Sequence, residues 1–265
     1  MIQQIDHRLW FSLNGALRLC LAKHGDLLGN RYPLVNEYPK SGGSWFAQML
    51  ADSMGLPFPR NRLPMFADSV LHGHYLYSQS FKDVCVVWRD GRDVMVSWYF
   101  HKVVGNELSS AKATNAVVKY LGFKDPNDIQ HNLSKFIEYS FQEQIQPRFS
   151  WTEFVDAWLD KPVFHTKYEQ LLSEPEQELK RALAWFGCNN VSDLEIDNII
   201  SNYSFSNQSG RVQGDEESSS YLRKGVSGDW VNHFTLQSKE IFNEYAGAHL
   251  IRLGYESDYS WLSGQ

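Results

Sequence analysis

Residues 33–50 read PLVNEYPKSGGSWFAQML, and this stretch predicts a strand, a tight glycine loop and the start of a helix. The mostly apolar run of residues 33–38 ends at Pro39, and apolar side chains recur at helical spacing from Trp45 onward. A strand-to-helix junction of this kind points backbone N–H groups and the positive end of the helix dipole at one spot. The stretch therefore predicts a phosphate-binding loop.

The loop residues themselves suit an anion. Lys40 supplies a full positive charge, and the hydroxyls of Ser41 and Ser44 can donate hydrogen bonds. Gly42 and Gly43 have no Cβ, so an anion can approach their backbone closely. The lysine precedes the glycines, whereas the nucleotide loop G-x-x-x-x-G-K-[ST] places it after them. The alternative is a plain strand-to-helix turn that carries an exposed lysine.

A second unit of the same kind follows at residues 83–88 (DVCVVW), which predict a buried strand of a parallel sheet. Arg89 stands at the end of this strand, and Ser97 lies in the helix predicted after it. Ligands of open α/β sheets bind at the carboxyl ends of the strands, so both loops are expected at one edge. The alternative is a surface arginine paired with a neighbouring aspartate. We expect Arg92 and Asp93 to pair with each other or with solvent.

A third motif, residues 223–230 (RKGVSGDW), is a glycine-rich loop with two cations that could close over a phosphate. The three motifs, in this order, resemble those of the cytosolic-type sulfotransferases, which use 3′-phosphoadenosine 5′-phosphosulfate (PAPS). The resemblance covers most of the chain. It implies an α/β fold of the P-loop NTPase-like kind, with three α/β/α layers and a central, mostly parallel sheet. We expect a single domain over residues 1–265, with residues 1–31 packed on it as an N-terminal helix.

The resemblance also implies which residues bind PAPS. Residues 40–44 would hold the 5′-phosphosulfate, Arg89 and Ser97 would hold the 3′-phosphate, and the two cations of the third motif could close over a phosphate. Aromatic side chains would contact the adenine, for which stacking is worth ~1–3 kcal/mol per base. The implied cofactor-binding residues are Lys40, Ser41, Gly42, Gly43, Ser44, Trp45, Arg89, Ser97, Tyr168, Phe205, Arg223, Lys224 and Gly225.

The candidate general base is a histidine. The family carries a Lys-Thr-His segment before the arginine strand, and this chain has His72-Gly73-His74 there. Alignment places His74 on the base and His72 on the lysine, and leaves open whether His72 is itself the base. An imidazole with a pKa near its ordinary ~6.5 suits removal of a proton from a hydroxyl. Lys40 would stabilise the departing phosphate, and we predict that the in-line transfer needs no metal.

Composition limits the partners. The net charge of −6 argues against nucleic acid and anionic membranes. Three widely spaced cysteines argue against a disulfide framework. We expect a small-molecule or glycan acceptor with a hydroxyl, a cytoplasmic location, and a monomer or homodimer. The amphipathic stretch 6–22 is either packed on the body or a surface that meets a membrane. The alternatives to a sulfotransferase are a P-loop kinase of a nucleoside or sugar and a non-catalytic nucleotide-binding protein.

Overall fold

The structure of the chain is a computed structural model that describes residues 7–60, 62–143 and 147–263, with side chains from residue 13 onward. These residues form two compact units. Unit 1 holds the chain up to residue 37 together with residues 42–88 and 162–204, and unit 2 holds residues 38–41, 89–161 and those from 205 onward. The single domain over residues 1–265 stays a prediction.

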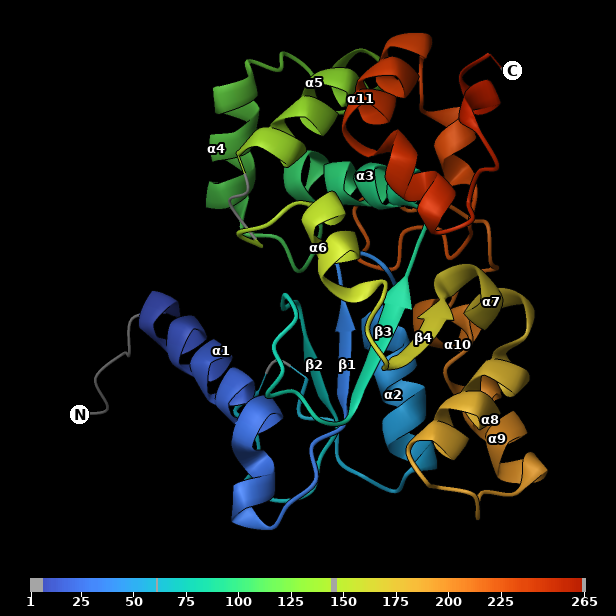
Figure 1. Cartoon of the computed structure of the whole chain (residues 1–265). Coiled ribbons are helices and arrows are strands. Elements are labelled where there is room, and N and C mark those ends of the chain that lie inside the picture. The colour runs from blue at the N-terminus through green and yellow to red at the C-terminus, as the bar shows by residue number, and fades with distance from the viewer. Residues whose placement is uncertain (1–6, 61, 144–146, 264–265) are drawn as a thin grey trace. The chain divides into compact units, whose positions relative to one another are not determined.

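Unit 1 contains a four-stranded sheet in the order β2-β1-β3-β4 (Figure 1). The strands are β1 (Leu34–Glu37), β2 (Leu71–Gly73), β3 (Val84–Trp88) and β4 (Phe164–Lys167). Every pair is parallel, whereas the sequence analysis expected a mostly parallel sheet. All five residues of β3 are buried, as its unbroken run of apolar side chains predicts.

Helices pack on this sheet within unit 1. They are α1 (His7–His24), α2 (Gly43–Ser53), α7 (Tyr168–Ser173), α8 (Pro175–Trp185) and α9 (Asp193–Asn202), with the 3-10 turn η1 (Gly25–Leu28). α2 contacts β1, β2, α8 and α9, and α1 contacts β2. Side chains of β1, α2 and α8 contribute to one buried hydrophobic core, which includes Val35, Leu50 and Leu179. Within the described chain, no helix combines the length and the apolar character that a membrane span requires.

Unit 2 is helical and has an aromatic core. Its elements are α3 (Gly91–Tyr99), η2 (Phe100–Val104), α4 (Ala111–Leu121), α5 (Ile129–Gln142), α6 (Trp151–Trp158), α10 (Phe205–Ser209), η3 (Asp229–Asn232), α11 (Leu236–Arg252) and η4 (Tyr259–Leu262). The side chains of Trp151, Phe154 and Phe242 are fully buried. Ser150 and Glu153 form a reciprocal capping box that begins α6.

Strand register fixes where the two predicted anion loops begin. β1 and β3 are neighbours, and Glu37 of β1 lies opposite Val87 of β3. The chain leaves β1 after Glu37 and leaves β3 after Trp88. The ends of β1 and β3, from which the two predicted loops depart, therefore lie side by side at the carboxyl edge of the sheet.

Candidate active site

The first loop makes a tight turn after β1. Ser41 N–H donates to the Tyr38 carbonyl at 3.2 Å. Lys40 has a φ of +75°, one of the rare left-handed conformations of a non-glycine residue in the chain. Gly42 has a φ of +90° and serves as the N-cap of α2. A left-handed lysine costs of order 1–3 kcal/mol, and such strain gathers at ligand-binding turns, so its presence here supports a functional loop.

The carboxylate of Glu37 takes part in this loop, which the sequence analysis did not foresee. Gly43 N–H, at the start of α2, donates to Glu37 Oε2 at 2.5 Å. Together with the Ser41 turn, this means that two loop amides donate within the protein. Of the backbone N–H groups expected to point at an anion, those of Ser41 and Gly43 are therefore already engaged.

The two predicted histidines meet at Glu37. His72 Nε2 lies 2.9 Å from Glu37 Oε1, and His74 Nδ1 lies 2.9 Å from the Glu37 carbonyl oxygen. The ring centroids of the histidines are 4.9 Å apart. A carbonyl only accepts, so His74 must donate through Nδ1–H and keep its lone pair on Nε2. That is the tautomer a general base needs.

The charge states of Glu37 and His74 follow from these contacts. Burial and the neighbouring His72 lower the pKa of His74 to about 4, so its imidazole is neutral near pH 7. Burial alone would raise the pKa of Glu37, but the hydrogen bond from His72, the nearby imidazoles and Gly43 N–H hold it below its ordinary value. The cluster thus consists of a carboxylate, a neutral His74 and a His72 that donates to the carboxylate.

The segment between the histidines is fixed by packing. Asn36 is fully buried; its side chain donates to the Tyr75 carbonyl and accepts from Tyr75 N–H, both at 2.9 Å. A Cβ on Gly73 would lie 2.1 Å from the Tyr75 ring, so only glycine fits between the histidines. The His-Gly-His sequence is therefore held against β1 by its neighbours on both sides.

Unit 1 also brings together two aromatic residues predicted to contact adenine. Trp45 and Tyr168 pack edge to face with ring centroids 6.0 Å apart. Trp45 Nε1 donates to the Tyr203 carbonyl at 2.7 Å. Trp45 belongs to the first turn of α2, in agreement with the helical spacing that begins at this residue. A Cβ on Gly42 would lie 2.5 Å from the Tyr168 ring, which explains why the loop needs glycine at that position.

In unit 2 one guanidinium joins the three sequence motifs. Arg89 donates through Nη1 to the Lys40 carbonyl at 3.0 Å and through Nη2 to the Val226 carbonyl at 3.1 Å. Its side chain is 11 % exposed and lies 3.9 Å from Asp93. Arg89 is therefore not a surface arginine, although it does lie beside a neighbouring aspartate, as the alternative expected. Ser97 lies on α3, partly exposed, as predicted.

The pairing expected between Arg92 and Asp93 is also wrong. Arg92 is buried and pairs with Asp90 at 2.7 Å and with Glu256. Asp90 is the N-cap of α3 and stands two residues away, so it reaches both the helix N–H and this guanidinium. Asp93 instead accepts from the backbone N–H groups of Gly228 and Trp230, and so anchors the third motif to α3.

The two cations of the third motif share an aspartate. Arg223 and Lys224 each lie 2.6 Å from the carboxylate of Asp229, which is 3 % exposed. Burial alone would raise the pKa of Asp229, but hydrogen bonds from His233, Lys224 and Arg223 hold it well below its usual range. Glu216 lies 2.7 Å from Arg223 on its other side. Both cations are therefore positioned before any phosphate binds.

Two further contacts order this part of unit 2. A Cβ on Gly225 would lie 2.3 Å from the Phe205 ring, so the predicted adenine contact packs directly on the third motif. Lys40 Nζ lies 3.9 Å from the centroid of the Tyr221 ring. Such a cation–π contact holds the ammonium while leaving its charge available.

Glu37, Asp93 and Asp229 hold the predicted site residues in place, although no motif in the sequence marked these three carboxylates as site residues. The sequence did carry one signal for Glu37, because it ends an apolar strand, and a carboxylate in that position is buried only when it is paired.

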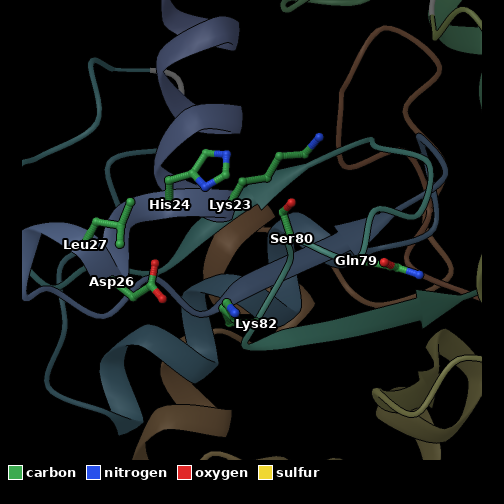
Figure 2. Close-up of a pocket in the computed structure, with 7 residues that line it drawn as sticks. All are labelled: Lys23, His24, Asp26, Leu27, Gln79, Ser80 and Lys82. Carbon is green, nitrogen blue, oxygen red and sulfur yellow. The ribbon is translucent and has the colours of Figure 1, made fainter.

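A separate shallow hollow of about 290 Å³ lies elsewhere in unit 1 (Figure 2). It is lined by Lys23, His24, Asp26, Leu27, Gln79, Ser80 and Lys82. None of the predicted site residues belongs to it.

The parallel sheet, with its glycine loop and arginine loop at neighbouring strand ends, defines a P-loop-like α/β protein. Residues 64–254 match the family described as "Sulfotransferase domain", and the chain belongs to this family. It is 24 % identical to rat Sulfotransferase 1A1 over 86 % of this chain and 86 % of that protein. It is also 24 % identical to rat Sulfotransferase 1 family member D1 over 80 % of each chain.

A solved structure shares the fold. The structure of mouse sulfotransferase SULT7A1 complexed with PAP superimposes with a TM-score of 0.59 at 18 % identity and covers 89 % of this chain and 91 % of that one. At this identity the match supports the fold alone. The predicted α/β class, and the resemblance to sulfotransferases, are confirmed.

Proposed function

We propose that this chain transfers the sulfuryl group of PAPS to a hydroxyl of a small-molecule or glycan acceptor. The observation that carries the proposal is the reach of Arg89, whose guanidinium hydrogen-bonds to the Lys40 loop and to the 223–230 motif. Three segments far apart in sequence thus meet at one cation. The PAP complex of the mouse relative supports the same choice of nucleotide.

Each implied binding residue has a role in this proposal. The loop of residues 40–44 holds the 5′-phosphosulfate, with Lys40 as its cation. Arg89, Ser97 and residues 223–225 hold the 3′-phosphate, and Asp229 keeps Arg223 and Lys224 in place. The aromatic residues Trp45, Tyr168 and Phe205 contact the adenine, for which their packing beside Gly42 and Gly225 is suited.

The reaction is an in-line displacement at sulfur. The acceptor oxygen forms a new bond to sulfur while the bond from sulfur to the bridging phosphate oxygen breaks. His74 takes the acceptor proton on Nε2, because its Nδ1 is committed to the Glu37 carbonyl. Negative charge grows on the departing phosphate, and Lys40 stabilises it. His72 stays in a supporting role, since its Nε2 is held by the Glu37 carboxylate.

Transfer from labelled PAPS to a panel of phenols, alcohols and sugars tests the proposal. We expect His74→Ala to lose about 10²–10⁴-fold in rate, the usual contribution of a general base. His72→Ala is expected to lose less. His131→Ala is the matched control, because the His131 side chain is 84 % exposed on α5.

Three outcomes would contradict this account. Activity that survives in His74→Ala but disappears in His72→Ala would reverse the assignment of the base. Mg²⁺-dependent phosphoryl transfer from ATP in place of sulfuryl transfer would favour a kinase. Tight binding of PAP without any transfer would favour a non-catalytic nucleotide-binding protein. The acceptor, the oligomeric state, membrane contact and the cytoplasmic location stay predictions.

A further inference from the structure

The ends of β1 and β2 bring two imidazoles and a carboxylate together in unit 1. Val35 of β1 lies opposite His72 of β2, and Asn36 lies opposite Gly73. Glu37 is the last residue of β1, and His74 directly follows β2. One ring nitrogen of each histidine and one oxygen of Glu37 all lie within 4.8 Å of one another. The shortest of these separations is the 2.9 Å between His72 Nε2 and Glu37 Oε1.

This donor set matches the preferences of first-row divalent metals. Zinc binds histidine nitrogen and carboxylate oxygen at ~2.0–2.2 Å, and a His₂Glu set leaves a fourth position open. Two imidazoles with one carboxylate also form the facial triad of other metals. Ligand atoms ~2 Å from one ion are separated by about 3–4 Å, which the spacing of the cluster already approaches.

The surroundings also resemble the outer shell of a metal site. A histidine ligand usually donates its second ring N–H to a carbonyl or carboxylate, which fixes the ring. His74 makes such a contact with the Glu37 carbonyl. The second carboxylate oxygen of Glu37 is held by Gly43 N–H, so Oε1 is the oxygen that can turn to an ion. Binding through His72 Nε2 requires the neutral ring to carry its proton on Nδ1.

A second cluster of possible ligands lies beside two cations, which exclude a metal ion. Glu216, Asp229 and His233 of unit 2 satisfy the same distance criterion. Asp229, however, already accepts from the cations Arg223 and Lys224, both 2.6 Å away. A divalent ion there would face two positive groups at contact distance, so that cluster is not a metal site. Glu37 instead hydrogen-bonds to an imidazole and a backbone amide.

We propose that Glu37, His72 and His74 form a binding site for a divalent transition metal ion of the Zn²⁺ class. The ion is an inhibitor and not a cofactor, because it occupies imidazole lone pairs that proton removal requires. The inhibition rests on the proposed function, whereas the binding of the ion does not. The sequence alone offers the His-Gly-His pair, but the third ligand comes from a strand 35 residues earlier.

Calorimetric titration of the metal-free protein with Zn²⁺ tests the binding directly. We expect one ion per chain, and affinity at least about tenfold weaker in Glu37→Gln and in His72→Asn, since even outer-shell changes cost about 10–100-fold. His131→Asn, a change of an exposed histidine, is expected to leave the affinity unaltered. No binding by the wild type, or equal binding by all the variants, would overturn the proposal.

The visible absorption of added Co²⁺ keeps the test decisive if a variant fails to fold. Bound Co²⁺ in an imidazole and carboxylate set of low coordination number absorbs more strongly than the aqueous ion. An unchanged aqueous spectrum with the wild type would overturn the proposal. With PAPS transfer as a separate readout, Zn²⁺ is expected to inhibit and a chelator to restore activity. A chain that binds Zn²⁺ but transfers nothing would sink the proposed function and leave the metal site standing.

Discussion

The carboxylates of Glu37 and Asp229 stand at similar depths in their respective units but hold different kinds of partner. Glu37 is 2 % exposed and binds His72 and a backbone amide, whereas Asp229 is 3 % exposed and binds Arg223 and Lys224. An imidazole can exchange donor and acceptor roles between tautomers, but guanidinium and ammonium groups can only donate. The first cluster is therefore suited to moving a proton, and the second to presenting fixed positive charge.

The largest effect that separates the two clusters is expected from Asp229→Asn. Removal of one partner of a buried ion pair leaves uncompensated charge, so we expect the free energy of unfolding to fall by about 3 kcal/mol at pH 7. In Glu37→Gln the side-chain N–H can donate to the other tautomer of His72, so the loss is expected to be nearer 1 kcal/mol. Urea unfolding measures both, with Asp215→Asn, an exposed carboxylate, as the control.

The stabilisation that Asp229 contributes is expected to decrease as the pH falls. The folded-state pKa of Asp229 is depressed, so its stabilisation is present above its unfolded pKa of ~3.9 and is lost as pH falls below that value. The wild type should thus lose its advantage over Asp229→Asn in acid. An advantage that stays the same from pH 7 to the acid limit, or equal losses in the two carboxylate variants, would break the comparison.

How much of this could be predicted depended on whether the contacts were local. The strand, loop and helix of residues 33–50 and the capping box at Ser150 follow from spacing and breaker residues within one short window. The partner of Arg92 depended on a competition that composition does not resolve, because Asp93 is adjacent in sequence but Asp90, two residues away, caps the helix and takes the guanidinium. The backbone N–H groups that donate to Asp93 lie more than 130 residues away, so these contacts emerge only from the tertiary fold.

In the site, too, local features could be predicted and contacts between distant segments could not. The order of the motifs pointed to the positively charged residues, and the resemblance implied their roles. It did not identify Glu37, since the link between Glu37 and His72 requires the pairing of β1 with β2. For a related reason the sequence does not reveal that Gly43 N–H is taken by that carboxylate.

A smaller loss of stability is expected when Gly225 of the third motif is replaced. Gly225 and Gly228 have φ of +70° and +76°, so alanine at either position adopts the same unfavourable conformation. A Cβ at Gly225 would meet the Phe205 ring at 2.3 Å, whereas one at Gly228 meets nothing within 4 Å. We expect Gly225→Ala to be less stable than Gly228→Ala by about 1–3 kcal/mol.

The same two variants test whether the Phe205 ring contacts the adenine. Displacement of the Phe205 ring in Gly225→Ala should weaken PAP binding in calorimetry. Gly228→Ala, which has the same backbone strain without the clash, should retain more of it. Equal stabilities and equal affinities in the two variants would show that the Phe205 ring does not pack on this loop as described.

The central claim is that separate groups of donors recognise the two phosphate ends of one adenosine cofactor. Calorimetry of the wild-type chain with adenosine 3′,5′-bisphosphate and with adenosine 5′-monophosphate tests it without any mutation. Charge-assisted hydrogen bonds are worth about 1.5–3 kcal/mol each, so loss of the 3′-phosphate should weaken binding by at least about 100-fold. Equal affinities for the two nucleotides, or no heat with the bisphosphate, would contradict the account.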